Sequence, residues 1–131
     1  MRQYEKIPEA TEALARQVVD AAFAVHKNLG PGLLESVYEV CLCHELSKRG
    51  IPFRSQVSLP VVYDGVRLDA GLRLDLLVGE ALIVELKAVE KHNPLFEAQL
   101  LTYLKLTGHR LCLLINFNVP LIKDGIRRIV L

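Results

Sequence analysis

The order of apolar and polar residues along the chain predicts three helices and five strands. The first helix is expected from Thr11 to Leu29, with Thr11 as the N-cap, because apolar residues recur there at spacings of three and four. The turn Gly30-Pro31-Gly32 should end it, and a second helix should run from about Leu33 to Arg49. The expected buried residues are Leu14, Val18, Ala21 and Val25 in the first helix and Leu34, Val37, Cys41 and Leu46 in the second.

The middle of the chain alternates between apolar and polar residues, which is typical of strands. The segment Phe53–Tyr63 should be an edge strand, because Pro60 lacks a backbone donor. Asp64-Gly65 is a strong hairpin turn. The next two strands are expected at Val66–Val78 and Ala81–Val89.

The remaining elements alternate helix with strand. Asn93-Pro94 is typical of a helix start, and this third helix should extend to about Thr107 and end at Gly108. The segment Arg110–Phe117 is apolar throughout, so we expect a strand covered on both faces and parallel to an earlier one. A turn at Lys123-Asp124-Gly125 should lead to a last strand, Ile126–Leu131.

The hairpin between the second and third strands contains two carboxylates, and the length of its loop decides whether they lie on the same face of the sheet. If the loop is Gly79-Glu80-Ala81, Asp75 lies opposite Glu85, whereas a two-residue loop would put them on opposite faces. Alternation also places four apolar residues of the second strand on one face: Leu72, Leu74, Leu76 and Val78.

Facing carboxylates in so apolar a strand pair require a compensating charge. Two unit charges about 4 Å apart repel by roughly 4 kcal/mol at an effective dielectric constant near 20. Lys87 offsets part of this repulsion, and a hard divalent cation such as Mg²⁺ or Mn²⁺ offsets more of it. The alternative is a solvated face of ion pairs, but the apolar segment Ala81–Val89 favours a cleft.

Composition narrows the class of protein. A length of 131 residues fits a single domain, 1–131, and no apolar run approaches the roughly 20 residues that span a membrane. The start of the chain is polar, without the pattern of a signal peptide. The cysteines, Cys41, Cys43 and Cys112, lack metal-site spacing and are expected to be buried, reduced thiols of a cytoplasmic protein.

The net charge of +1 gives no sign of a broad basic surface for nucleic acid, although basic residues collect near the end of the chain. They form either an edge that faces phosphates or a solvated edge, and the sequence leaves both open. They are Lys105, Arg110, Lys123, Arg127 and Arg128, with Asp124 as the acidic neighbour.

Four motifs resemble one nuclease superfamily. Asp75, nine intervening residues and Glu85-Leu86-Lys87 resemble the PD-(D/E)xK motif, with Leu74 in place of its proline. The segment from Gly32 to Tyr38, with Glu35 at its centre, resembles the signature of the mostly prokaryotic GxxExxY family, and Val25–Pro31 resembles its lead-in. Gln99 and Tyr103 resemble the QxxxY motif on the helix after the ExK strand, and the segment from Asn116 onward resembles the family's ending. The resemblance extends from about Leu14 to the C-terminus.

This resemblance implies an α/β fold with a restriction-endonuclease-like αβββαβ core, a mixed central sheet flanked by helices. It also implies that Asp75 and Glu85 hold Mg²⁺ or Mn²⁺, with Glu35 as a third carboxylate that acts directly or through water. Lys87 is implied either to orient and help deprotonate the attacking water or to stabilise charge on the phosphate. The groups implied to position these residues or contact the substrate are Gln99, Tyr103, Tyr38 and His26. Without the resemblance, Glu35 would be interpreted as a solvated first-turn glutamate and His26 as a packed side chain.

Two functions follow as expectations. The first is a metal-dependent phosphodiesterase that cleaves DNA or RNA, which the set Asp75, Glu85 and Lys87 favours. The second is a catalytically silent nuclease fold that binds nucleic acid or a protein partner, which the small size and near-neutral charge favour. Whether the chain forms a homodimer, and whether cleavage is internal or from an end, stays open.

Overall fold

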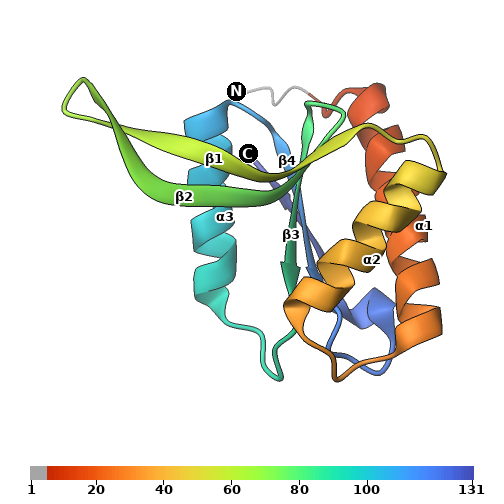
Figure 1. Ribbon diagram of the computed structural model, residues 1–131. Helices are drawn as coiled ribbons and strands as arrows, with labels where there is room; N and C mark the ends of the chain where they lie inside the picture. The colour runs from red at the N-terminus through yellow and green to blue at the C-terminus, as the bar shows by residue number, and fades with distance from the viewer. Residues whose placement is uncertain (1–5) are drawn as a thin grey trace.

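The computed structural model describes residues 6–131, which form an α/β fold around a five-stranded sheet of order β1-β2-β3-β4-β5. Strands β3 and β4 are parallel and the other neighbours are antiparallel, so the sheet is mixed, as expected. Helices α1 and α2 lie together on one side of the sheet and α3 lies on the other (Figure 1). The elements are α1 (Glu9–Leu29), α2 (Glu35–Lys48), β1 (Phe53–Tyr63), β2 (Val66–Val78), β3 (Leu82–Lys87), α3 (Pro94–Thr107), β4 (Leu111–Asn116), the 3-10 helix η1 (Ile122–Gly125) and β5 (Ile126–Val130).

The local signals for turns and helix ends are confirmed. Asp64 and Gly65 both have positive φ angles, 55° and 70°, as a tight hairpin between right-twisted strands requires. The Asn93 side chain accepts a hydrogen bond from the Leu95 N–H at 2.9 Å and caps α3. Gly108 ends that helix in the left-handed conformation, with φ of 77°. Sequence-local chemistry therefore determines these boundaries.

The two parallel strands form the centre of the molecule. Every residue from Leu82 to Leu86 and from Leu111 to Ile115 is buried, because helices cover both faces. The predicted covered strand and its parallel pairing are thus confirmed.

Two local predictions are wrong. Helix α1 begins at Glu9 after Pro8, and Thr11 is a buried residue of its first turn instead of the N-cap. Acidic residues in that turn suit the helix dipole without a side-chain cap. The third strand is shorter than Ala81–Val89. The expected turn at Lys123-Asp124-Gly125 forms as part of η1 and leads into β5.

The buried side of α2 also differs from the prediction. Leu34 and Val37 are exposed, at 74% and 37% of their full accessible area. The Tyr38 ring stacks on Phe117 with centroids 4.6 Å apart, and this contact turns a different stripe toward the core. The buried stripe is Tyr38, Leu42 and Leu46, at spacings of four.

Along the β1–β2 hairpin, alternate side chains switch from one side of the sheet to the other in the middle of the strands. The alternation of apolar and polar residues did not predict this switch. Leu76 and Val78 pack beneath α1 and α2, whereas Leu72 and Leu74 pack against α3. The change occurs where Gln56 of β1 has a left-handed backbone, with φ of 52°. A single residue outside the extended region reverses the order in which later side chains alternate.

The helices and the cysteines bear on two further expectations. None of the helices in residues 6–131 is both long and apolar enough to cross a membrane. All three cysteines are free: Cys112 is buried, but Cys41 and Cys43 are only partly buried, against the expectation that all three are buried.

Candidate active site

The register of the β2–β3 hairpin brings the two predicted carboxylates together. The pairs are Val78–Leu82, Leu77–Ile83 and Leu76–Val84, so the loop is Gly79-Glu80-Ala81. This confirms the three-residue alternative, in which Asp75 lies opposite Glu85. The ladder stops one residue before this pair, and the two strands separate there.

Side-chain hydrogen bonds replace the ladder at this separation. The Asp75 N–H donates to Oε1 of Glu85 at 2.9 Å, and the Leu86 N–H donates to Oδ2 of Asp75 at 2.9 Å. Each carboxylate thus accepts a backbone donor of the facing strand, which satisfies amide groups that the separation would otherwise leave unpaired. The exchange fixes both carboxylates between β2 and β3.

The electrostatics of this pair are unfavourable for two negative charges. Glu85 is 6% exposed, and burial followed by the negative charge of Asp75 raises its pKa to about 8. Lys87 acts in the opposite direction and lowers it. The pKa of Glu35, on the first turn of α2, is also raised, first by partial burial and then by Asp75. The surroundings therefore disfavour a second negative charge where the strands separate, and a bound cation would favour the ionised form of these carboxyl groups.

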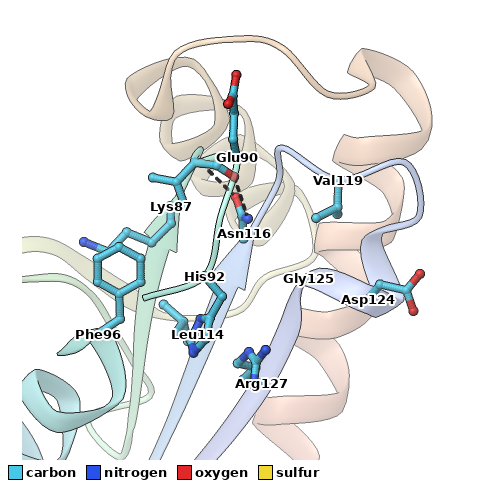
Figure 2. A pocket seen from close by; sticks show the side chains of 11 residues that line it. Lys87, Glu90, His92, Phe96, Leu114, Asn116, Val119, Asp124, Gly125 and Arg127 are labelled. Carbon is cyan, nitrogen blue, oxygen red and sulfur yellow. Dashed lines mark hydrogen bonds between the residues drawn. The ribbon is translucent and has the colours of Figure 1, made fainter. Parts of the chain in front are cut away.

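Lys87 has a second neighbour besides the carboxylates. Its ammonium lies 4.6 Å from the centroid of the Phe96 ring, a cation–π contact with α3. Both side chains line a cavity of about 120 Å³. Figure 2 shows them there together with His92 and Arg127, which also line it. Lys87 lines this cavity, but Asp75 and Glu85 do not. The cavity therefore lies on the lysine side of the site.

The predicted Gln99–Tyr103 pair is formed. Nε2 of Gln99 donates to the Tyr103 hydroxyl at 3.0 Å. Tyr103 is buried, and burial, followed by the charges of Glu85 and Asp75, raises its pKa. The pair therefore lies close enough to the carboxylates to respond to their charge.

Tyr38 and His26 make their hydrogen bonds to backbone atoms of loops. The Tyr38 hydroxyl donates to the Gly30 carbonyl at 2.6 Å and accepts from the Leu33 N–H at 3.2 Å. Nε2 of His26 hydrogen-bonds the Val119 carbonyl at 2.8 Å. These polar atoms hold loops, and the role that the resemblance implies for the two residues beside the site stays a prediction.

The side chains available as donors limit how this site could bind a metal ion. Within residues 6–131, no group of three or more His, Cys, Asp or Glu side chains lies close enough together to hold a metal ion. Glu35 therefore does not complete a direct three-carboxylate site in this conformation. Two adjacent carboxyl groups whose joint ionisation needs a positive charge nevertheless fit a hard divalent cation, because Mg²⁺ often binds through one or two carboxylates and keeps several waters.

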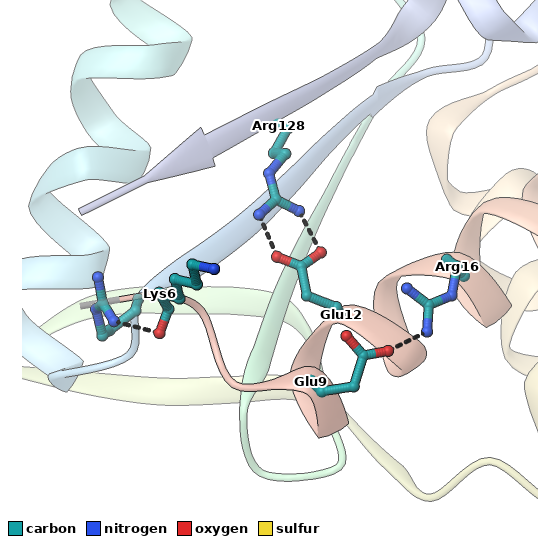
Figure 3. Close-up of polar contacts among 6 residues, drawn as sticks. Lys6, Glu9, Glu12, Arg16 and Arg128 are labelled. Carbon is teal, nitrogen blue, oxygen red and sulfur yellow. Dashed lines mark hydrogen bonds and ion pairs between the residues drawn. The ribbon is translucent and has the colours of Figure 1, made fainter. Parts of the chain in front are cut away.

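Part of the basic edge is neutralised within the molecule. Arg128 of β5 makes two hydrogen bonds to the Glu12 carboxylate of α1 (Figure 3). Arg127 lies 3.3 Å from Glu97 of α3. These two arginines connect helices to β5, which supports a solvated, ion-paired edge at their positions.

Sequence reasoning missed two polar residues near Asp75. Glu39 lies four residues after Glu35 on α2 and accepts a hydrogen bond from Gln56 of β1 at 2.7 Å. The four-residue spacing was a visible signal, because it places both glutamates on one face of the helix. Nothing in the sequence indicated Gln56.

A comparison with protein families matches residues 12–129 to the PD-(D/E)XK nuclease superfamily. The chain belongs to this superfamily. Membership indicates a nuclease-type function with a nucleic acid substrate, and nucleases of this superfamily generally use divalent metals. Searches of curated proteins and of solved structures find no match.

Proposed function

We propose that this superfamily member is a metal-dependent nuclease of the GxxExxY branch that hydrolyses phosphodiester bonds of DNA or RNA. One observation carries the proposal: Asp75 and Glu85 exchange hydrogen bonds with the facing backbone where β2 and β3 separate. That exchange holds the two carboxylates between the same pair of strands, with the lysine of the same motif two residues after Glu85 on β3. A purely structural hairpin would gain nothing from a buried pair of like charges.

The roles of the residues follow from their places. Asp75 and Glu85 would hold Mg²⁺ or Mn²⁺, and Glu35 would contact the hydrated ion through water. The ion would supply charge neutralisation at the scissile phosphate and a bound water of lowered pKa. Lys87 would orient the attacking water or stabilise negative charge on the phosphate. Gln99 would fix the Tyr103 hydroxyl, so that this residue supports the carboxylates from the side of α3.

The second candidate is a binding module that has lost catalysis. It is favoured by the net charge of +1 and by the ion pairs of Arg127 and Arg128, which leave less positive charge for phosphates. In either case we propose one domain, and free thiols that fit the reducing cytoplasm. Recruitment of nucleic acid by a homodimer or a protein partner would compensate for the modest charge.

The deciding experiment is a cleavage assay on single-stranded DNA, double-stranded DNA and RNA with Mg²⁺ or Mn²⁺. The Glu85→Gln protein, purified in parallel, excludes a contaminating nuclease. Cleavage by the wild type that is absent in Glu85→Gln supports the nuclease. Binding of nucleic acid or a partner without cleavage under any condition supports the module.

A further inference from the structure

Gln56 has an unusual backbone for a residue within a strand. Its φ of 52° lies in the left-handed region, which costs free energy for any residue with a side chain. The other non-glycine residues with positive φ among residues 6–131 are Asp64 and Glu80, and both lie in hairpin loops. Turn geometry explains those two, but it does not explain Gln56.

The position of Gln56 relates it to the candidate site. The β1–β2 ladder passes from the pair Ser55–Leu76 to the pair Val57–Leu74, so Gln56 lies opposite Asp75 without forming a ladder pair. At this point the apolar side chains of the two strands switch from one side of the sheet to the other. The strained residue Gln56 of β1 therefore lies beside Asp75, the residue of β2 at which the β2–β3 ladder has stopped.

The side chain of Gln56 reaches α2. Its Nε2 donates to Oε1 of Glu39 at 2.7 Å. Glu39 is one helical turn after Glu35, and the charge of Asp75 acts on both glutamates. One hydrogen bond thus ties the start of α2 to the point where the carboxylates gather.

We propose that Gln56 is a positioning residue that, through Glu39, holds the first turn of α2 and the Glu35 side chain over the gap between β2 and β3. The strained backbone directs the amide toward α2. The inference rests on the proposed function, because it assigns Gln56 and Glu39 to the same metal-binding site.

The test compares Mn²⁺ affinity, cleavage and melting temperature in Gln56→Gly, Glu39→Gln and the exchange Gln56→Glu with Glu39→Gln. Gln56→Gly should weaken Mn²⁺ binding about 10-fold, the loss typical of groups that orient metal ligands. It should lower kcat with KM for nucleic acid unchanged, and it should not lower the melting temperature, because glycine relieves the left-handed strain. The exchanged pair should restore affinity, since it re-forms the hydrogen bond with its ends reversed.

Glu80→Gly is the matched control. Glu80 is also left-handed, with φ of 55°, and its carboxylate binds Arg54 of β1 at 2.6 and 2.8 Å, but it lies in the hairpin loop. This variant should leave Mn²⁺ affinity and cleavage unchanged.

The outcomes separate the inference from the proposed function. Mn²⁺ affinity that is the same in Gln56→Gly as in the wild type overturns the inference, whether or not the wild type cleaves. The inference is also overturned if Gln56→Gly lowers both the melting temperature and the Mn²⁺ affinity and the exchanged pair restores neither. If the wild type cleaves nothing, but Mn²⁺ affinity falls in Gln56→Gly and returns in the exchanged pair, the inference is supported and the nuclease proposal fails.

Discussion

Replacing Glu85 with glutamine should stabilise the metal-free protein at alkaline pH, although it removes a proposed catalytic residue. The reason is the buried carboxylate pair. Burial and the charge of Asp75 raise the pKa of Glu85 from 4.5 to about 8, so its ionised form is disfavoured in the folded state. Glutamine keeps an oxygen that can accept the Asp75 N–H but never carries a charge.

The sign follows from proton binding. Between pH 4.5 and 8 the unfolded chain releases the Glu85 proton while the folded protein retains it, so the stability of the wild type falls as pH rises through this range. At about 1.4 kcal/mol per pH unit, the loss has an upper limit of roughly 5 kcal/mol. Burying an amide in its place offsets part of the gain, so we expect Glu85→Gln to be more stable by about 1 to 3 kcal/mol above pH 8.

The assay is urea or thermal unfolding in EDTA at pH 5 and pH 8.5. The gain should appear at pH 8.5 as a rise of several degrees, at roughly 3 to 5 °C per kcal/mol for a chain of this length, and should be small at pH 5. Glu80→Gln is the control, because Glu80 is exposed and paired with Arg54, so it should show no such gain. Equal effects of Glu85→Gln at both pH values would refute the reasoning.

The remaining predictions concern metal, catalysis and packing. Mn²⁺ at a hundredfold excess over Kd should stabilise the wild type by about 2.7 kcal/mol in thermal melts, and an equal rise in Asp75→Asn would mean that the ion binds elsewhere. Lys87→Ala should reduce cleavage at least about 100-fold in single-turnover assays while Mn²⁺ affinity persists; unchanged cleavage would contradict its role. Tyr38→Phe removes the hydroxyl that bonds Gly30 and Leu33, so it should lower the free energy of unfolding by about 1 to 2 kcal/mol and leave cleavage intact. A selective loss of cleavage in Tyr38→Phe would instead support the implied role of this residue beside the active site.

The candidate site was only partly visible in the sequence. The spacing of Asp75, Glu85 and Lys87 pointed to the correct strands, because a motif within one hairpin depends on short-range geometry. The choice between two hairpin loops stayed open until the structure showed the pairs. Gln56 and Glu39 were missed because their contact joins β1 to α2, and no sequence period relates those positions.

The sequence by itself determined the features that depend on neighbours along the chain. Turn residues set the Asp64-Gly65 hairpin, Asn93 and Gly108 bounded α3, and continuous apolar runs marked the two covered strands. These features rest on backbone conformations and hydrogen bonds that a few adjacent residues provide.

Only the tertiary structure decided which faces meet. Stacking of Tyr38 on Phe117 turned α2, so that the apolar Leu34 and Val37 became exposed. Leu72 and Leu74 lie on the opposite side of the sheet from Leu76 and Val78, and the change falls opposite the left-handed Gln56 of β1. Both outcomes depend on packing between elements far apart in sequence, where several apolar stripes compete to be buried and the contacts of the whole core select one.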